Sequence, residues 1–431
     1  TAGLDADLPD DPNTLVASVE GWHVRGTVEE PATVEYRGYT VCKCDTWTQG
    51  PALLQALRLV EGFDVKSLGH RSADYVHLTV EALKLAFADR DTWYGDPEFV
   101  EVPLDKLLSD DYTELRRPLI DMAVASPEAR PGDPYAMQAV KTDGVFRPGG
   151  PGTTTCVVAD RWGNVVAATP SANVYHPGGS GTTGVSYGNR LRSLNTTPGH
   201  PNCIAAGKRP RITLTPTMVL KDGQPVLAIS VAGGDLQDQT ALCLLLDHIE
   251  FGMAPAEAVI APRFATQHHQ DSFDPNPDRV QTFKEVGSLT ISEAVEQDVC
   301  KQLAQRGHKV EAKTGPIGTP VMLLADQGTY YAAGDPAAND FADEAEAFRL
   351  AASSPYGLSA AVFTRSLAAA YRFTEKLQAG IVNINEMSSY WEPHVPAGGA
   401  SGTQSGLGRT GGRHTLMEMC DLKTMVVDIA V

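Results

Sequence analysis

The chain has 431 residues, of which 42% are hydrophobic and 20% are charged. This composition excludes disorder as the main state, and the length predicts two or three structural units. Lys and Arg number 35 against 53 Asp and Glu, and the net charge of −18 argues against general electrostatic binding to nucleic acid or anionic membranes. No apolar run is long enough to span a membrane. Because the chain begins at Thr1 rather than Met, we expect a processed chain or a fragment.

The first 150 or so residues are predicted to form one strand and three helices, followed by a loop. The expected elements are a strand at 33–44 and helices at 48–61, 72–88 and 112–122. Thr48 and Ser72 are the expected N-caps of the first two helices, because their hydroxyls can accept a hydrogen bond from the first helical turn. Residues 141–152 are rich in Gly and Pro and predict a flexible loop.

The pattern changes to strands after this loop. The expected elements are a hairpin of strands 154–158 and 165–169, strands at 213–220 and 226–231, helices at 239–251 and 292–305, and a hairpin within 321–332. Because helices and strands fall in separate runs, we predict a layered α+β fold with helices packed on a pair of antiparallel sheets.

The composition changes again near residue 340, where we place a domain boundary. After it we expect helices at 343–352, 367–377 and 415–419 and strands at 360–364, 381–384 and 424–429.

Thr153 directly follows the Gly- and Pro-rich loop and opens a predicted strand. A Thr hydroxyl is a weak nucleophile without a base, but its own α-amino group can serve if the chain is cut before it. Gly152 favours this cut, because glycine can adopt the strained conformation in which the Thr153 hydroxyl attacks the preceding carbonyl. Gly233–Gly234, at the start of a predicted helix, can offer N–H groups to the developing oxyanion. The alternative is an ordinary turn into a strand.

Motifs spread over roughly residues 30–338 resemble the γ-glutamyltransferase family of N-terminal nucleophile hydrolases. Those similar to its small subunit are GTTTCVVADRWGNVVAATPSAN (152–173), GKRPRITLTPTMVLKDG (207–223), VAGGDLQDQ (231–239), EFGMAPAEAVIAPRF (250–264) and AAGDP (332–336). Those similar to the end of its large subunit are EYRGYTV (35–41), EALKLAFADR (81–90) and YGDP (94–97). The resemblance implies a four-layer αββα sandwich, in which 1–152 is large-subunit-like and 153–340 is the small-subunit-like catalytic region.

The resemblance also implies catalytic positions. Thr153 matches the catalytic threonine, and the bond Gly152–Thr153 matches the site of self-cleavage. Ser171 falls on a hydroxyl residue that hydrogen-bonds the nucleophile, Asn173 on the neighbouring asparagine, and Gly233–Gly234 on the oxyanion pair. The alternative is that Ser171 and Asn173 only end a strand. The implied activity is an amidohydrolase or acyltransferase that forms an acyl-threonine intermediate and needs neither cofactor nor metal.

The positions that bind the donor in the family differ here. The acidic residue that holds the donor's α-amino group falls on Ser193, and its amide neighbour on Arg190. Of the serine pair that contacts the donor carboxylate, Ile212 replaces the first and Thr213 keeps a hydroxyl. Because Arg190 would repel an ammonium group, we hypothesise a donor with an anionic end and no ammonium, anchored by Arg190 or Arg192. The alternative is that both arginines are solvated surface charges.

Residues 341–431 resemble the carboxyl end of aldehyde dehydrogenases, in SSPYGLSAAVFTR (353–365), AGIVNIN (379–385) and SGLGRTGGR (405–413). That family's nucleotide-binding domain and catalytic motifs have no counterpart here. We therefore expect a tail that oxidises no aldehyde, binds no nicotinamide cofactor and favours homo-oligomers through its exposed strands. The alternative function is an inactive remnant that serves as a scaffold for this tail.

The seven cysteines are scattered and odd in number, which predicts free thiols rather than a disulfide framework. This favours a reducing compartment, while the family resemblance leaves the periplasm open. Cys42 and Cys44 have no second ligand pair nearby, and the adjacent His268 and His269 point in different directions, so neither pair predicts a metal site. The expected partner is a small-molecule amide or γ-glutamyl-like substrate, not nucleic acid or a membrane.

Overall fold

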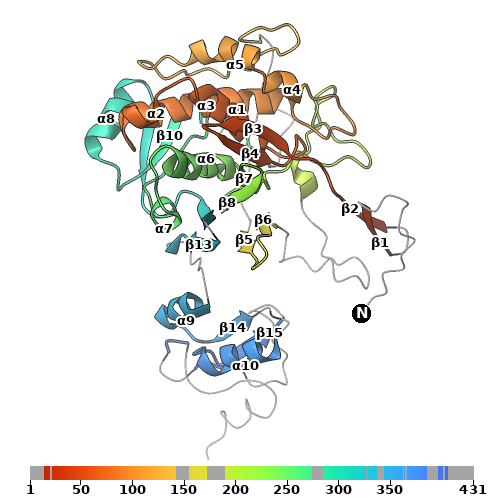
Figure 1. Cartoon of the computed structure of the whole chain (residues 1–431), viewed down its shortest axis with the longest axis vertical. Coiled ribbons are helices and arrows are strands. Elements are labelled where there is room, and N and C mark those ends of the chain that lie inside the picture. Colours follow the sequence, from red (N-terminus) through yellow and green to blue (C-terminus); the bar gives the residue numbers. More distant parts are fainter. Residues whose placement is uncertain are drawn as a thin grey trace, which may run out of the picture. The chain divides into compact units, whose positions relative to one another are not determined.

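The chain divides into two compact units, Thr1–Asp340 and Phe341–Val431 (Figure 1). The computed structural model describes residues 14–19, 22–141, 155–171, 190–273, 285–326, 328–336, 344–362, 364, 366–385, 397–400 and 403–405.

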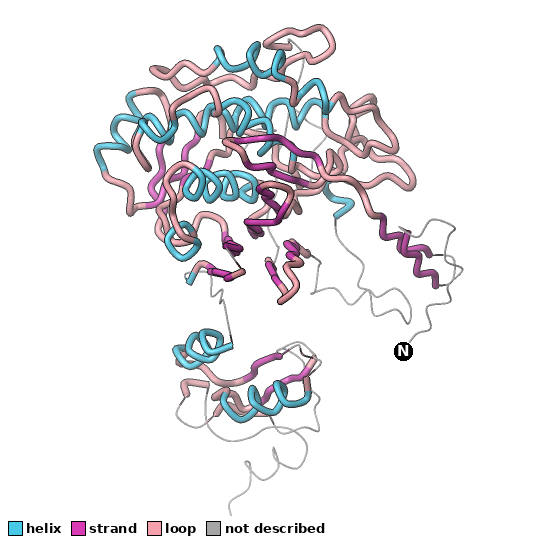
Figure 2. The backbone as a smooth tube through the Cα atoms, in the orientation of Figure 1, coloured by secondary structure: helices cyan, strands magenta, loops and turns pink. Residues whose placement is uncertain are grey.

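A six-stranded antiparallel sheet forms the centre of the first unit (Figures 1 and 2). In spatial order its strands are β13 (Thr329–Gly334), β12 (Thr319–Asp326), β8 (Gln224–Ala232), β7 (Thr217–Lys221), β4 (Tyr39–Lys43) and β3 (Ala32–Tyr36). The pairing of β4 with β7 joins the chain before residue 142 to the chain after residue 154. The predicted large-subunit-like region (1–152) and small-subunit-like region (153–340) therefore contribute strands to the same sheet.

The single strand predicted at 33–44 is in fact the hairpin β3–β4. Its two-residue loop is Arg37–Gly38, with φ angles of 51° and 80°. Such a loop needs positive φ at both positions, which glycine adopts freely. The prediction was wrong because the apolar alternation continues through both strands and conceals the turn.

Helices α1 (Pro51–Val60) and α6 (Leu236–Ile249) pack on one face of the sheet, and α3 (Ala73–Trp93) packs against α1 (Figure 1). Every residue of α6 from Gln237 to Asp247 is buried, and α3 is buried along nearly its whole length. Both are therefore core helices rather than surface helices with one apolar side.

Helix α3 continues to Trp93 instead of ending near Ala88 as predicted. The charged residues that suggested its end, Asp89, Arg90 and Asp91, are all buried. Each has an oppositely charged partner on another segment, which allows charged side chains to stay in the interior.

The two predicted N-caps have different outcomes. Ser72 is confirmed as the cap of α3, since its Oγ accepts a hydrogen bond from Tyr75 N at 3.1 Å. Thr48 is not the cap of α1, which follows Gly50 and begins at Pro51. The Thr48 hydroxyl instead accepts from Gly50 N at 3.0 Å and donates to the carbonyl of Asp45 at 2.9 Å.

The hairpin of β5 (Cys156–Ala159) and β6 (Val165–Ala168) lies against β8 and β12, on the side of the sheet opposite the helices (Figures 1 and 2). Thr169, just after β6, shares a 2.8 Å hydrogen bond with Ser230 of β8. The described part of the first unit thus has a helical layer, a six-stranded sheet and this hairpin as a further layer.

A smaller sheet and several short elements complete the first unit. The sheet contains β11 (Lys309–Lys313), β10 (Ser288–Ser292) and β9 (Phe264–Ala265), and α8 (Gln297–Gln305) packs on α3. The helix predicted at 292–305 starts only at Gln297, because β10 ends at Ser292 and a turn follows it. The helix predicted at 112–122 is an α-helix that ends at Arg116, followed by a 3-10 helix that ends at Leu119. The other elements are β1 (Thr14–Val19), β2 (Trp22–Thr27), α2 (Val65–Leu68), α4 (Leu104–Leu107), α5 (Asp110–Arg116), η1 (Arg117–Leu119), η2 (Arg190–Ser193) and α7 (Pro255–Ala258).

The second unit contains α9 (Glu344–Ser353), β14 (Ser359–Val362), α10 (Leu367–Lys376) and β15 (Ile381–Ile384), with β14 and β15 parallel. Ala370 is the one buried hydrophobic residue among those described in this unit. Its large exposed hydrophobic residues are Tyr356, Leu358, Leu367, Tyr371 and Ile384. The helix predicted at 415–419 and the strand predicted at 424–429 lie outside the described residues.

In the described part of the chain, no helix combines the length and the apolar character needed to cross a lipid bilayer.

Candidate active site

The Gly233–Gly234 turn joins β8 to α6, and its backbone conformation requires glycine. The φ angle is 144° at Gly233 and 61° at Gly234, values that other residues rarely adopt. A Cβ on Gly234 would lie 3.2 Å from Cε2 of Phe273, and one on Gly233 would lie 3.1 Å from Cβ of Leu236. A side chain at either position would therefore strain the turn and press on its neighbours.

The N–H groups of this turn are available for a ligand. Leu236 N donates to Gly233 O and Gln237 N to Gly234 O, each at 3.1 Å, so the carbonyl groups are occupied. Among the loop and side-chain hydrogen bonds of the described residues, none uses the N–H of Gly233 or Gly234 as donor. Both groups lie at the N-terminal end of α6, where the helix dipole favours negative charge. The turn can therefore stabilise the oxyanion of an acyl-transfer reaction.

Hydrogen bonds of Asp235 and Gly234 tie the turn to segments that are distant in the sequence. Its Oδ1 accepts hydrogen bonds from Arg90 Nη1 at 2.7 Å and Ser272 Oγ at 2.6 Å, and its Oδ2 accepts from Ser272 N at 3.1 Å. Gln49 Nε2 also donates to Gly234 O at 3.3 Å. Three separate segments therefore hold the turn.

Arg90 is fully buried, and each nitrogen of its guanidinium group has a partner. Nε donates to Asp91 at 2.8 Å, Nη1 to Gln49 Oε1 and to Asp235 at 2.7 Å, and Nη2 to the carbonyl of Gln270 at 2.7 Å. Burial alone would lower the pKa of Arg90, but the neighbouring carboxylates outweigh burial and raise that pKa. Arg90 is therefore a permanent cation below the turn.

Arg211 supplies a second buried cation to the same network. It donates to Asp91 Oδ1 and to Ser272 Oγ, each at 3.1 Å. Burial and the nearby charge of Arg90 lower the pKa of Arg211 to about 10, so it remains protonated at neutral pH. Two arginines thus face the carboxylates of Asp91 and Asp235, and this balance is what a buried ionic network needs.

Arg190 and Arg192 lie over the ring of Phe273 beside the turn, and Arg190 also contacts Ser171. The guanidinium carbons of Arg190 and Arg192 lie 5.2 Å and 5.3 Å from the ring centre, and Arg190 Nη2 donates to Ser171 Oγ. Burial and the charge of Arg192 lower the pKa of Arg190. Phe273 also packs against Gly234. Three predicted site positions, Arg190, Arg192 and Gly234, therefore lie around one aromatic ring.

Ser193 and Thr213 lie deeper than Arg190. Their exposed fractions are 2% and 0%, and in the described part of the chain neither hydroxyl has a hydrogen-bond partner. Thr213 belongs to a segment that runs beside Trp47 and Gln49, with hydrogen bonds of 3.0 Å on either side of Ile212. These hydroxyls can bind a ligand only where a polar group reaches the interior.

Gly152, Thr153 and Asn173 lie outside the described residues, so their roles stay predictions. The structure describes the chain again from Thr155, and β5 begins at Cys156. Because β5 lies against β8, the strand that follows the predicted nucleophile packs on the strand that leads into the glycine turn.

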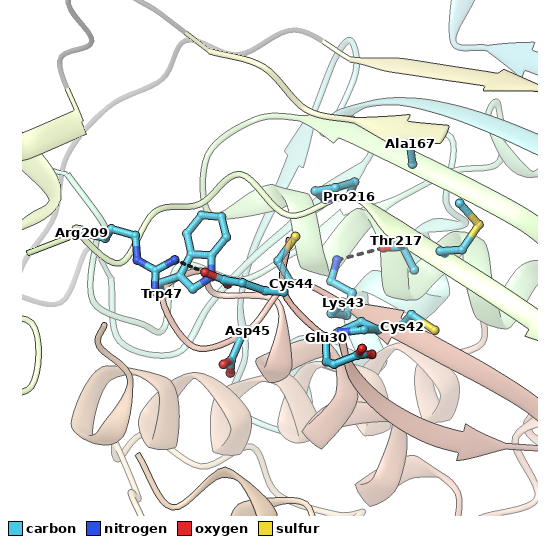
Figure 3. A pocket seen from close by; sticks show the side chains of 13 residues that line it. Glu30, Cys42, Lys43, Cys44, Asp45, Trp47, Ala167, Arg209, Pro216 and Thr217 are labelled. Carbon is cyan, nitrogen blue, oxygen red and sulfur yellow. Dashed lines mark hydrogen bonds and ion pairs between the residues drawn. The ribbon is translucent and has the colours of Figure 1, made fainter. Parts of the chain in front are cut away.

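A pocket of about 540 Å³ lies between β4, β7 and Ala167 of β6 (Figure 3). Arg209 stacks 5.1 Å over the ring of Trp47 there and pairs with Glu29 at 2.5 Å. Lys43 Nζ donates to Thr217 Oγ1 at 2.9 Å. None of the described site residues lines this pocket, which is therefore separate from the glycine turn.

Comparison with known proteins decides the family. The family model described as gamma-glutamyltranspeptidase matches residues 23–344. The chain belongs to the γ-glutamyltranspeptidase family. A second model, that of the aldehyde dehydrogenase family, matches residues 337–425.

Relatives within the γ-glutamyltranspeptidase family include a hydrolase and an acylase. The chain is 32% identical over 323 residues to the glutathione hydrolase proenzyme of Bacillus subtilis (strain 168), a match covering 73% of this chain and 52% of that protein. It is 34% identical over 299 residues to the acylase ACY 1 proenzyme of Pseudomonas sp. (strain SE83), covering 69% and 48%. The solved structure of LmbA2991HD has a TM-score of 0.62 and 37% identity, covering 74% of this chain and 55% of that one. The chain spans about half the length of the curated relatives it matches.

Sequence reasoning missed the residues that hold the turn of this γ-glutamyltranspeptidase-family chain, which are Arg90, Asp235, Ser272 and Phe273. The signal that could have found Arg90 is the run of three charged residues, 89–91, in a helix that is otherwise apolar on several sides. Charged residues in such a helix require buried partners.

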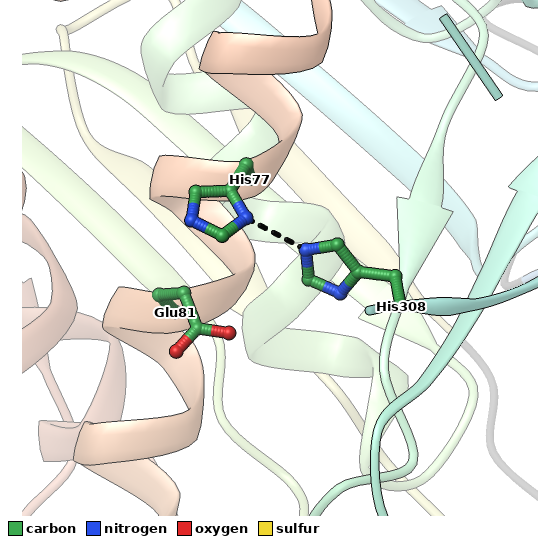
Figure 4. A group of neighbouring side chains, drawn as sticks. All are labelled: His77, Glu81 and His308. Atoms are coloured by element: carbon green, nitrogen blue, oxygen red, sulfur yellow. Dashed lines mark hydrogen bonds between the residues drawn. The ribbon is translucent and has the colours of Figure 1, made fainter. Parts of the chain in front are cut away.

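One buried group of side chains could in principle hold a metal ion: His77 and Glu81, both on α3, and His308 (Figure 4). One possible ligand atom from each residue lies within 4.8 Å of the others. Glu81 already accepts from Lys84 at 2.7 Å and from Arg130 at 3.0 Å. His77 Nδ1 lies 2.8 Å from His308 Nε2, and His77 Nε2 lies 2.8 Å from the carbonyl oxygen of Asp121. Since two cations occupy the carboxylate, we interpret the group as a neutral hydrogen-bonded histidine pair.

The buried histidines predict that acid destabilises the fold. Burial, with the charge of Lys84, lowers the pKa of both His268 and His308 to about 3 from an ordinary value of 6.5. As the pH falls below 6.5, the unfolded chain takes up protons that the folded chain cannot, so each histidine lowers the free energy of unfolding by up to about 1.4 kcal/mol per pH unit.

Urea unfolding at about pH 7.5 and about pH 5.5 measures this effect. We expect a smaller free energy of unfolding at the lower pH, and a weaker pH dependence in a His308→Gln variant. An equal pH dependence in the wild-type chain and the variant would contradict the interpretation.

Proposed function

We propose that this chain is a γ-glutamyltransferase-like amidohydrolase that transfers an acyl group through Thr153. Family membership supports an enzyme of this class, with hydrolase and acylase relatives. The observation that carries the proposal is the Gly233–Gly234 turn. It presents two N–H groups at a helix N-terminus, next to the strand on which β5 packs.

Maturation would proceed by a shift of the acyl group from nitrogen to oxygen. The Thr153 hydroxyl oxygen attacks the Gly152 carbonyl carbon, the peptide C–N bond breaks as the ester C–O bond forms, and the hydroxyl proton passes to the released amine. Water then hydrolyses the ester, leaving a carboxylate on Gly152 and a free hydroxyl and α-amino group on Thr153.

Turnover would use the same residue as nucleophile and base. The hydroxyl of Thr153 attacks the donor carbonyl while its α-amino group takes the proton and passes it to the leaving amine. The N–H groups of Gly233–Gly234 stabilise the oxyanion, with Ser171 and Asn173 orienting the nucleophile. Water or an amine then attacks the acyl ester and regenerates the hydroxyl.

The donor would carry an anionic end and no ammonium group. Arg190 and Arg192 lie together over Phe273, at partly buried positions, and Arg190 contacts Ser171. Two guanidinium groups favour a carboxylate and repel a cation. Ser193 and Thr213 would supply hydroxyls toward the deeper end of the donor site.

We further propose that the sheet and the β5–β6 hairpin belong to a four-layer αββα sandwich. Val158 and Val166 face each other across the hairpin and are 52% and 57% exposed. Exposed valines on paired strands suit a sheet surface that receives another layer.

The proposed role of residues 341–431 is self-association through an aldehyde dehydrogenase-like tail that carries no nicotinamide site. The match of that family's model and the exposed apolar side chains of this unit support this role. Leu367 and Tyr371, four residues apart on α10, are 72% and 63% exposed and share one helix face.

Light scattering of the full chain tests the tail. We expect a dimer or larger assembly, and a monomer when Leu367→Asp and Tyr371→Asp are combined, because charges oppose burial of that face. Ile260→Asp, at a residue 62% exposed in the first unit, is the matched control and is expected to keep the assembly. A monomeric wild-type chain would contradict this role.

Hydrolysis of two matched donors tests the proposed reaction. Glutaryl p-nitroanilide, which lacks the ammonium group, is expected to have a higher kcat/KM than γ-glutamyl p-nitroanilide. Arg190→Ala should raise KM for the glutaryl donor by about tenfold or more, since a charge-assisted hydrogen bond is lost. Thr153→Ala should abolish turnover.

Arg161→Ala is the control for the loss of an arginine, because Arg161 stacks on the exposed Trp162 in the β5–β6 turn. An unchanged KM in Arg190→Ala would remove Arg190 as the anchor, and full turnover in Thr153→Ala would overturn the mechanism.

A further inference from the structure

We infer that Asp235 is a positioning residue for the oxyanion site, and that the buried Arg90 and Ser272 hold it in place. The inference rests on the proposed function, because it assigns a role within that same site. Asp235 itself is buried, with an exposed fraction of 5%, and acts through the backbone of Gly233–Gly234.

The contacts of Asp235 place it at the point where the turn is fixed. It follows Gly234 directly and precedes α6, yet its side chain makes no capping hydrogen bond to the first turn of that helix. Both carboxylate oxygens are directed to Ser272 instead, and one of them also accepts from Arg90. An aspartate at a helix N-terminus ordinarily caps the helix, so this side chain serves a different purpose.

The charge of Asp235 explains why Arg90 is needed. A lone carboxylate next to the turn would oppose the developing oxyanion, because two negative charges in a buried site repel strongly. Arg90 contacts Asp235 Oδ1 at 2.7 Å and Arg211 reaches the same group through Ser272. The Arg90–Asp235 ion pair therefore fixes the backbone without adding net negative charge to the oxyanion site.

The geometry gives this network control over the N–H groups. The turn has left-handed backbone at two successive residues, and glycine itself imposes no preference for that conformation. Gln49 and Arg90 bind each other and contact Gly234 O and Asp235, respectively, so the turn is held on both sides. Loss of the Asp235 contacts should release the N–H groups from the orientation that an oxyanion requires.

Asp235→Asn and Ser272→Ala in the full chain test this role. Each is expected to lower kcat for glutaryl p-nitroanilide by about 10- to 100-fold with KM within about threefold, because the transition state loses its donors and the ground state does not. A boronic acid analogue of the glutaryl group, which forms a tetrahedral adduct, should bind more weakly by the same factor. Binding of glutarate, a planar carboxylate, should be unchanged.

Asp247→Asn is the matched control. Asp247 is a fully buried carboxylate in the last turn of the same helix α6, where it pairs with Arg71 at 2.6 Å and His70 at 3.0 Å. We expect it to destabilise the fold by a similar amount but to leave kcat unchanged. An equal loss of kcat in Asp247→Asn, or an unchanged kcat in both Asp235→Asn and Ser272→Ala, would overturn the inference.

Amide hydrogen exchange separates this inference from the proposed function. The amides of Leu236 and Gln237 donate to the two carbonyls of the turn, so their exchange rates report its integrity without any turnover. We expect exchange about tenfold faster or more in Asp235→Asn and Ser272→Ala, and wild-type rates in Asp247→Asn. If the wild-type chain cleaves no donor, the proposed function fails, while unchanged exchange in both variants contradicts the positioning role itself.

Discussion

Arg90 and Asp235 pair in an interior where neither charge could remain alone, since an unpartnered buried charge destabilises a fold by several kcal/mol. Arg90 comes from α3 and Asp235 from the start of α6, so the pair brings together two core helices from distant parts of the chain. The carboxylate of Asp91, also on α3, adds Arg211 to the same network. The same network binds Asp235, which follows the glycine turn, and Ser272, which precedes Phe273.

The same interior keeps the two halves of the first unit together across residues 142–154. Strand β4 pairs with β7, and Lys43 of β4 forms a buried 2.9 Å ion pair with Asp238 of α6. Neither contact depends on a continuous chain between the halves. A fold built in this way can tolerate a break before Thr153, which is what an N-terminal nucleophile requires.

The sequence predicted local features well and tertiary ones poorly. The Ser72 cap and the β12–β13 hairpin depend on neighbouring residues, so periodicity and local side-chain chemistry were sufficient. The length of α3 was underestimated because Asp89, Arg90 and Asp91 look like a solvated helix end, and only partners far away in the sequence show that they are buried. The grouping of Arg190 and Arg192 around Phe273 could not be derived either, since Phe273 lies in no predicted motif. The glycine turn itself was predicted because two adjacent glycines before a helix allow a tight turn with backbone angles that other residues rarely adopt.

Mass spectrometry of the purified chain under denaturing conditions, combined with N-terminal sequencing, detects cleavage of the Gly152–Thr153 bond. We expect two polypeptides, one ending at Gly152 and one beginning at Thr153, that remain associated under native conditions. In Thr153→Ala we expect a single uncut chain. A wild-type chain that stays whole, or that is cut at another bond, would rule out Thr153 as an N-terminal nucleophile.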